Sequence, residues 1–143
     1  MRKTIQLLAA ATSIASLGLM TVPANADNAI IQINKKGDRS ASAKIAYVAV
    51  WVTCSEDTTS AELVATLTQV TSGGTQTATA SVTSLSAFEC SGEEELFLMP
   101  VRRPTGGFKW VKGKARVTDF HFTTADPSGV YTDTAKGRTV KLM

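Results

Sequence analysis

The stretch CSEDTTSAELVATLTQVTSGGTQTATASVTSLSAFEC, residues 54–90, lies between the only two cysteines of this 143-residue chain. Leu63, Ala65 and Leu67 alternate with polar residues and share one face of a predicted strand. A second strand, predicted over residues 75–82, follows a Gly-Gly turn signal. The stretch therefore predicts a β-hairpin, and with it an all-β fold.

Turn chemistry sets the expected register of this hairpin. If Gly73-Gly74 forms a two-residue turn, Leu67 lies opposite Ala80 and Ala65 lies opposite Val82, apolar against apolar. A slip by one residue would mix the apolar and polar faces. The hydrophobic pattern and the turn thus predict the same register.

The first residues have the pattern of a secretory signal peptide. Arg2 and Lys3 precede a long apolar run, and Ala24-Asn25-Ala26 is a small-x-small cleavage site. We therefore expect residues 1–26 to be removed and residues 27–143 to form a single secreted domain without a transmembrane segment. In an exported chain, two cysteines far apart in sequence predict one disulfide, here between Cys54 and Cys90.

The residues before Cys54 predict a long strand over residues 44–54 that faces the core. Its even positions form one continuous apolar row that ends in Cys54. Its odd positions, which include Tyr47 and Trp51, are nearly as apolar. This second row either packs under a neighbouring element or forms an exposed aromatic strip, so Tyr47 and Trp51 are a candidate binding strip.

The rest of the chain predicts further short strands, which together with the hairpin would form a β-sandwich. Pro100 has no amide proton, so we expect the end of its strand to lie at a sheet edge or to leave the sheet. Short strands at regular spacing with a disulfide favour a single immunoglobulin-like antiparallel β-sandwich of about seven strands. The remaining strands are predicted over residues 29–33, 96–101, 113–122 and 139–142, with turns at residues 34–38 and 126–129.

The predicted strand over residues 113–122 changes parity part-way along. Ala115 and Val117 fall on one face, whereas Phe120 and Phe122 fall on the other. A bulge near Thr118-Asp119 would bring all four to one face, and a strand buried on both faces would also explain them.

Several short motifs follow one another in a characteristic order. A Val-rich strand ends in Cys54, Leu67-Thr68-Gln69 precedes a Gly-Gly turn, Cys90-Ser91-Gly92 follows, and the chain ends in an aromatic-x-x-Gly-x-Ala segment at residues 110–115 and TVKL at residues 139–142. This order resembles small secreted single-domain β-sandwich proteins of actinobacteria, a family of unknown function. The resemblance implies the fold, export and a core position for Trp110, and it implies no catalytic residue. Lys112 stands where many members have proline, and the extra cysteines frequent in the last third of the family are missing.

Catalytic and metal chemistry have few candidates in this sequence. His121 is the only histidine; Asp119 lies two residues away, and no Gly-x-Ser-x-Gly elbow accompanies them. Three consecutive glutamates at residues 93–95 splay to both sides of the chain and indicate a solvated turn. We therefore expect a protein that is not an enzyme and holds no metal or cofactor.

Residues 101–116 combine basic and aromatic residues without an acid. On a secreted protein such a segment can bind polyanions through phosphate contacts and stacking. Lysines along a strand can also serve only to discourage edge-to-edge aggregation. The candidate binding surface consists of Arg102, Arg103, Phe108, Lys109, Trp110, Lys112, Lys114 and Arg116.

Together these features predict a secreted, non-enzymatic binding or surface module of unknown partner. A cell-envelope polymer or another extracellular protein would fit, whereas intracellular nucleic acid would not. One alternative is a small extracellular inhibitor or effector that acts through the loop from Arg102 to Trp110. The other is polyanion or cell-wall binding through the basic-aromatic segment.

Overall fold

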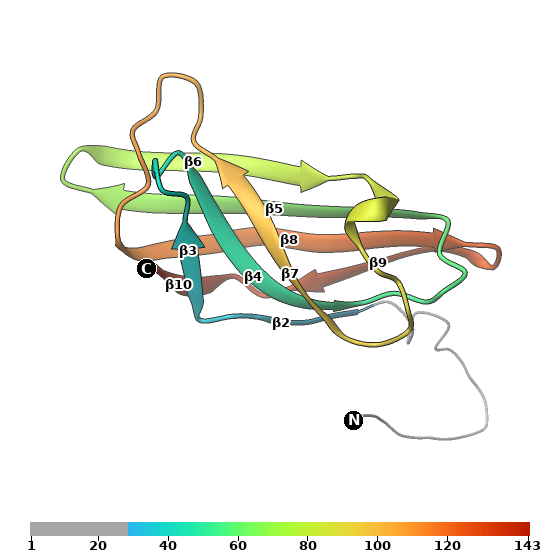
Figure 1. Ribbon diagram of the computed structural model, residues 1–143. Helices are drawn as coiled ribbons and strands as arrows, with labels where there is room; N and C mark the ends of the chain where they lie inside the picture. Colours follow the sequence, from blue (N-terminus) through green and yellow to red (C-terminus); the bar gives the residue numbers. More distant parts are fainter. Residues whose placement is uncertain (1–28) are drawn as a thin grey trace.

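The computed structural model describes residues 29–143, which form strands and one short 3-10 turn (Figure 1). The predicted signal peptide over residues 1–26 lies outside the described residues. In chain order the elements are β2 (Ala29–Ile33), β3 (Lys36–Arg39), β4 (Ile45–Thr53), β5 (Ser60–Thr71), β6 (Gly74–Val82), η2 (Leu85–Ala87), β7 (Glu95–Arg102), β8 (Gly113–Asp126), β9 (Gly129–Ala135) and β10 (Arg138–Leu142).

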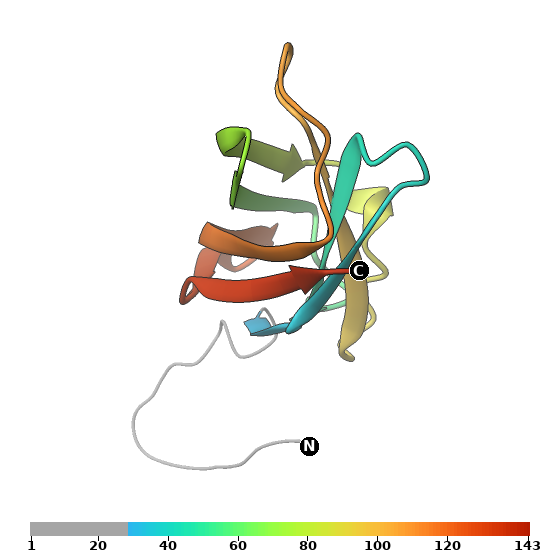
Figure 2. The same cartoon turned by 90° about the vertical axis from the view of Figure 1, so that its left-hand side faces the viewer.

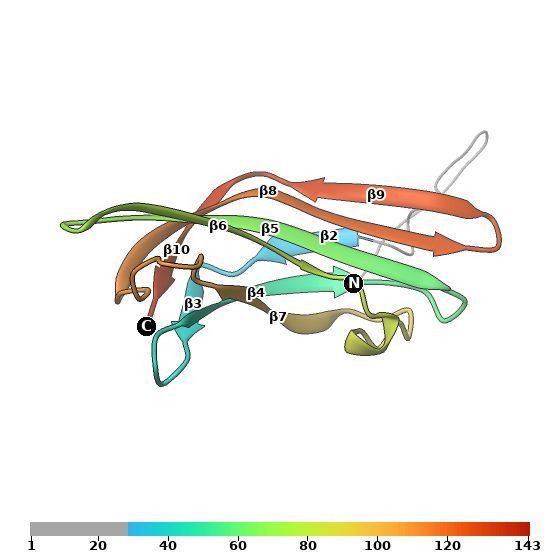
Figure 3. The same ribbon diagram turned by 90° about the horizontal axis from the view of Figure 1, so that it is seen from above.

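The strands form one sheet that curls into two facing layers (Figure 2). Its strand order is β2-β4-β3-β10-β8-β5-β6, with β7 paired to β4 and β9 paired to β8. β10 and β9 follow one another along the same edge of β8 (Figure 3). The all-β, sandwich-like prediction is confirmed, with nine strands in the described residues instead of about seven. No helix in this part of the chain is long and apolar enough to cross a membrane.

A parallel contact makes the sheet mixed, where a wholly antiparallel sheet was expected. β3 begins within the turn predicted at residues 34–38, and it pairs antiparallel with β4 and parallel with β10. This small strand therefore joins the two layers at one edge. β9 was also not predicted as a strand; it follows the predicted turn at residues 126–129, where Asp126 pairs with Gly129.

The core fills the space between the layers, as the alternation in β4 and β5 predicts. The even row of β4 is almost fully buried, and on β5 every second residue from Ala61 to Gln69 is buried. Phe88 contacts the rings of Phe97 and Phe122, with centroid distances of 4.6 and 5.2 Å. Side chains from both layers thus meet in one hydrophobic cluster.

The predicted disulfide is confirmed at one end of this cluster. Cys54 and Cys90 are bonded, with their Cα atoms 4.5 Å apart. The Gly92 amide also donates to the Cys54 carbonyl at 2.8 Å. The bridge therefore ties the end of β4 to the segment that enters β7.

The β5–β6 hairpin forms, but its register differs from the prediction. Leu67 pairs with Ala78 instead of Ala80, and Thr71 pairs with Gly74, so the turn residues are Ser72 and Gly73. Gly74 has φ +124°, a conformation that favours glycine. The shift is by two residues, so each side chain keeps its predicted face.

The bulge predicted near Thr118-Asp119 is confirmed. On β5 a single residue, Ala65, separates the partners of Thr118 and His121, whereas two residues separate them on β8. Asp119 has φ +52° at this irregularity. As a result Phe120 is buried on the same side as Val117.

Candidate anion-binding surface

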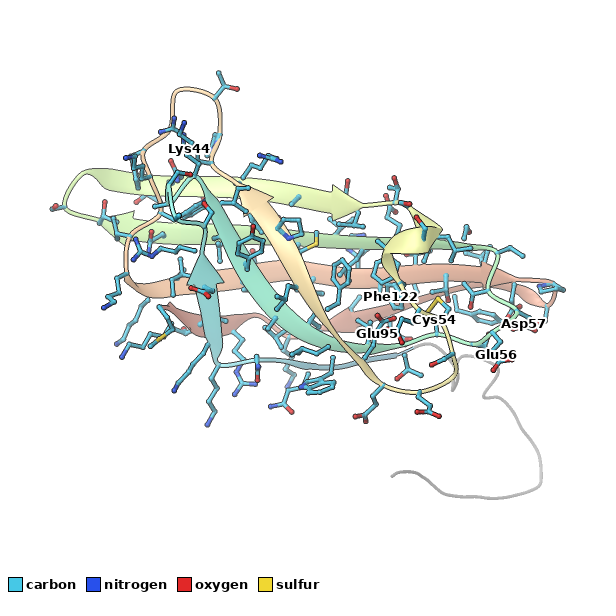
Figure 4. All side chains as sticks on the ribbon, viewed as in Figure 1. Lys44, Cys54, Glu56, Asp57, Glu95 and Phe122 are labelled. Carbon is cyan, nitrogen blue, oxygen red and sulfur yellow. A yellow bond between two sulfur atoms is a disulfide. The ribbon has the colours of Figure 1, made fainter. Side chains whose placement is uncertain are left out.

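Charged side chains are separated along the length of the molecule, although the net charge is small. Of 15 basic residues, Arg2 and Lys3 fall in the predicted signal peptide, which leaves 13 against 12 acidic residues. Lys44 lies toward one end and Glu56 and Asp57 lie at the other, with Glu95 between them on the acidic side (Figure 4). The basic end comprises Lys35, Lys36, Arg39, Lys44, Arg102, Arg103, Lys109, Lys112, Lys114, Arg116 and Lys141, and the acidic end comprises Glu56, Asp57, Glu62, Glu89, Glu93, Glu94, Glu95 and Asp126.

Strand direction explains this separation. β4 begins after Lys44 and ends before Glu56, and β7 pairs with it antiparallel, running from Glu95 to Arg102. Both strands therefore join a basic connection at one end to an acidic connection at the other. Asp38 is the only acidic residue in the described segments that build the basic end.

Three lysines lie side by side on neighbouring strands at the basic end. Lys141 of β10 pairs with Lys114 of β8 on one side and with Lys36 of β3 on the other. All three side chains are exposed, while the alternate residues Val140 and Leu142 face the core. Like charges directly opposite one another destabilise a sheet. These residues, named here the lysine row, therefore concentrate positive charge at a cost to the fold.

A hollow of about 600 Å³ adjoins the lysine row on the outer face of β5, β8 and β10. Lys114 and Arg116 line it together with three threonines and the apolar residues Val70 and Ala115, and Thr139 pairs with Arg116 across the strands. Arg116 Nη1 makes only a long contact, 3.5 Å, to Thr139 Oγ1. Cations and hydroxyl donors together form the kind of surface that phosphate, sulfate and carboxylate groups bind.

The arginines near this surface donate to backbone or hydroxyl oxygens. Arg39 donates to the carbonyls of Met143 and Trp110, Arg103 donates to the Gly107 carbonyl, and Arg138 donates to the Ile33 carbonyl at 2.7 Å. The bonds of Arg103 and Arg138 fix their guanidinium groups without neutralising them, because a backbone carbonyl carries no net charge. Their positive charge therefore remains available to an anion from outside.

The structure divides the residues predicted as a basic-aromatic surface. Arg102, Lys109, Lys112, Lys114 and Arg116 are exposed, whereas Arg103 and Phe108 are half-buried. Trp110 is wholly buried, and its Nε1 donates to the Val101 carbonyl at 3.1 Å. The prediction that Trp110 belongs to a binding surface is thus wrong, because the indole is part of the core and cannot stack on a ligand.

Two buried glutamines hold the basic segment against the sheet. The Gln69 side chain accepts from the Val111 amide at 2.9 Å and donates to the Val111 carbonyl at 2.8 Å. Gln76 makes the same pair of bonds with the Phe108 backbone, both at 2.8 Å. The two amides thus replace a neighbouring strand for a segment that has none. The alternation of β5 and β6 places these glutamines inward, and that is the signal that could have identified them.

Replacing Gln69 with leucine is expected to lower the free energy of unfolding by about 1–3 kcal/mol, because the part-buried amide and carbonyl of Val111 would lose their hydrogen-bond partner. Urea denaturation measures the loss. Gln32→Leu is the matched control, since Gln32 is exposed and should tolerate the change. Equal losses in the two variants would contradict a structural role for the Gln69 amide.

Two members of the lysine row, Lys36 and Lys141, were not predicted as binding residues. Lys36 was assigned to a turn and Lys141 to a closing strand of no special interest, and the two lie far apart in the chain. Only the parallel pairing of β3 with β10 brings them together. The polar alternation of the last strand was the available signal, because it placed Lys141 outward.

The candidate strip of Tyr47 and Trp51 lies on the outer face of β4 and is half-buried. Ala49 between them is only 6% exposed. On the strand next to them, Leu96 pairs with Trp51 and Leu98 pairs with Ala49. The second row of β4 is therefore partly covered by its neighbours, with apolar surface left in contact with water.

Polar side chains also gather on the outer face of β8. His121 and Asp119 line a shallow hollow on the outer face of β8 together with Thr134, and no serine lines it. Burial raises the pKa of the Asp133 carboxyl, whose Oδ2 has no hydrogen-bond partner among the described residues. No three His, Cys, Asp or Glu side chains in residues 29–143 come together as metal ligands.

Searches with the whole chain find no matching family model, no matching curated protein and no matching solved structure.

Proposed function

We propose that this protein is a secreted, non-enzymatic binding module that holds a polyanion on the lysine row and in the adjoining hollow. The observation that carries this proposal is the register of Lys36, Lys141 and Lys114 across three adjacent strands. A cluster of exposed cations raises the local concentration of anions and favours their binding. A polymer with repeated negative groups would contact all three lysines at once.

Two features support an extracellular setting for this activity. The first 26 residues follow the pattern of a signal peptide. The Cys54–Cys90 disulfide fits an oxidising compartment, because the cytosol keeps most thiols reduced. Outside the cell, the matching ligands are phosphate-bearing or carboxylate-bearing polymers of the cell envelope.

Retention on immobilised heparin tests the proposal. The unaltered protein should be retained at low salt and released at moderate salt, because screening weakens each contact. The triple variant Lys36→Ala/Lys114→Ala/Lys141→Ala should pass through the column with little delay.

A variant of equal charge loss provides the control. Lys44→Ala/Lys109→Ala/Lys136→Ala removes three exposed lysines outside the row. It should remain retained more strongly than the first triple variant. Equal retention of the two variants would show that net charge, and not the lysine row, determines binding.

A second candidate function rests on the loop between β7 and β8. This loop projects from the molecule (Figure 1), and the Gly107 amide donates to the Pro104 carbonyl at 2.8 Å, which closes its tip. Extracellular protease inhibitors present rigid loops to their targets, so an inhibitor or effector acting through residues 102–110 remains an alternative. Stoichiometric inhibition of a secreted protease, with the loop left uncut, would support it; rapid cleavage within the loop would exclude it.

A further inference from the structure

The outer face of β4 and β7 carries an apolar strip. Three cross-strand pairs form it: Tyr47 with Pro100, Ala49 with Leu98, and Trp51 with Leu96. Leu96 and Leu98 are 46% and 54% exposed, so the strip is open to water on β7. Adjacent apolar side chains on one sheet face mark a surface that gains stability when it is covered.

Charge at the two ends of this strip has opposite sign. On β7 the outward row reads Leu96, Leu98, Pro100 and Arg102. Glu94 lies just before the strand, and both Glu94 and Arg102 are exposed. A second copy turned by 180° about an axis through Leu98 would place its own row against the first in the opposite direction. Glu94 of each copy then meets Arg102 of the other, and Leu96 meets Pro100. Such a surface is self-complementary, as a two-fold interface requires.

Pro100 decides how two copies would meet. β7 is an edge strand, since β4 is its only paired neighbour among the described strands. Pro100 has no amide proton to offer to a further strand, which disfavours edge-to-edge pairing. Contact through the outward side chains involves no backbone donor, so the faces and not the edges are suited to association.

We propose that a second copy of this chain covers the apolar strip, packed face to face with its β7 antiparallel to the first. The basic end of each copy then lies beside the acidic end of the other, which matches the separation of charge in Figure 4. The strip is only two strands wide, so the surface area that the two copies bury between them is small for a protein–protein interface. The dimer is therefore weak and reversible. This inference does not depend on the proposed polyanion site.

The lysine row lies outside the covered strip, and its nearest member is Lys36 of β3, the strand that pairs with β4 at Asp38 and Tyr47. The row belongs to the outer face of β3, β10 and β8, whereas the apolar strip belongs to the outer face of β4 and β7. A dimer would therefore present two lysine rows, and a long polyanion that reached both would bind more tightly than to one copy.

Sedimentation velocity over a range of protein concentrations tests the dimer. The unaltered protein should shift from monomer to dimer as its concentration rises, and less so at about 500 mM salt than at about 20 mM. Leu98→Glu should raise the dissociation constant about tenfold or more. The matched control is Val130→Glu on β9, because Val130 is 71% exposed and lies outside the strip. This variant should dimerise as the unaltered protein does.

Charge reversal tests the antiparallel arrangement. Arg102→Glu alone and Glu94→Arg alone should each weaken the dimer about threefold to tenfold, because each places like charges together. The double variant Glu94→Arg/Arg102→Glu should recover the original affinity. A protein that stays monomeric at every concentration, a Val130→Glu effect equal to that of Leu98→Glu, or a double variant that fails to recover would overturn the proposal.

Discussion

Replacing Trp110 with alanine is expected to lower the free energy of unfolding by about 3–5 kcal/mol. The side chain is wholly buried, and its Nε1 donates to the Val101 carbonyl, which would lose its partner. The Trp110 amide also donates to the Ala43 carbonyl at 2.9 Å, so the residue joins the basic segment to the loop that precedes β4. Its removal leaves a large cavity where these segments meet the core.

The other tryptophan provides the control for this experiment. Trp51 is half-buried on the outer face of β4, so Trp51→Ala should cost clearly less than Trp110→Ala. Urea denaturation followed by circular dichroism gives both values. A loss below about 1 kcal/mol for Trp110→Ala, or a larger loss for Trp51→Ala, would contradict the core position of Trp110.

Removing the disulfide is expected to have a similarly large effect. The variant Cys54→Ala/Cys90→Ala should lose about 3–4 kcal/mol, because a bridge across 36 residues restricts the unfolded chain. The loss is a large share of the net stability of a small domain. In thermal unfolding the unaltered protein should also lose stability after reduction by dithiothreitol, and the variant should unfold at the same temperature as the reduced protein or slightly below it.

The comparison with dithiothreitol separates the bridge from the packing of its sulfur atoms. Cys54 is 1% exposed, so alanine also removes buried volume. Unfolding temperatures that do not change on reduction would contradict a stabilising role for the bridge.

Alternating hydrophobicity was sufficient to predict the long strands. In β4 and β5 each inward residue is apolar or, at Gln69, satisfied by side-chain hydrogen bonds, so period and burial agree. The β8 bulge was predictable because Val117 and Phe120 have opposite parity and both belong inside. These features depend on side-chain pattern alone, and the sequence contains that pattern.

Features that depend on distant pairing were not predictable. Residues 36–39, KGDR, contain no apolar side chain, so β3 exists only through its contacts with β4 and β10. The register of the β5–β6 hairpin was wrong because a shift by two residues leaves every face unchanged, and hydrophobic pattern cannot distinguish the two registers. Turn chemistry alone had to choose, and two adjacent glycines allowed both choices.

The candidate site was predictable only in part for the same reason. Lys114 and Arg116 belong to a basic segment that stands out in the sequence, but their neighbours Lys36 and Lys141 arrive through β3 and β10. Trp110 was placed on the surface because basic and aromatic residues alternate there, although the resemblance already implied a core position. A short segment does not reveal which of its aromatic residues turn inward.

The salt dependence of polyanion affinity tests the central claim most directly. Binding of a single-stranded oligothymidylate, used as a phosphodiester probe, should weaken linearly in a plot of log K against log salt, with a slope of about −0.7 for each phosphate neutralised. Four contacts, from the lysine row and Arg116, give a slope of about −3, and Lys36→Ala/Lys114→Ala/Lys141→Ala should reduce its magnitude by about 2. A slope near zero, or one that the triple variant leaves unchanged, would contradict a polyanion site on the lysine row.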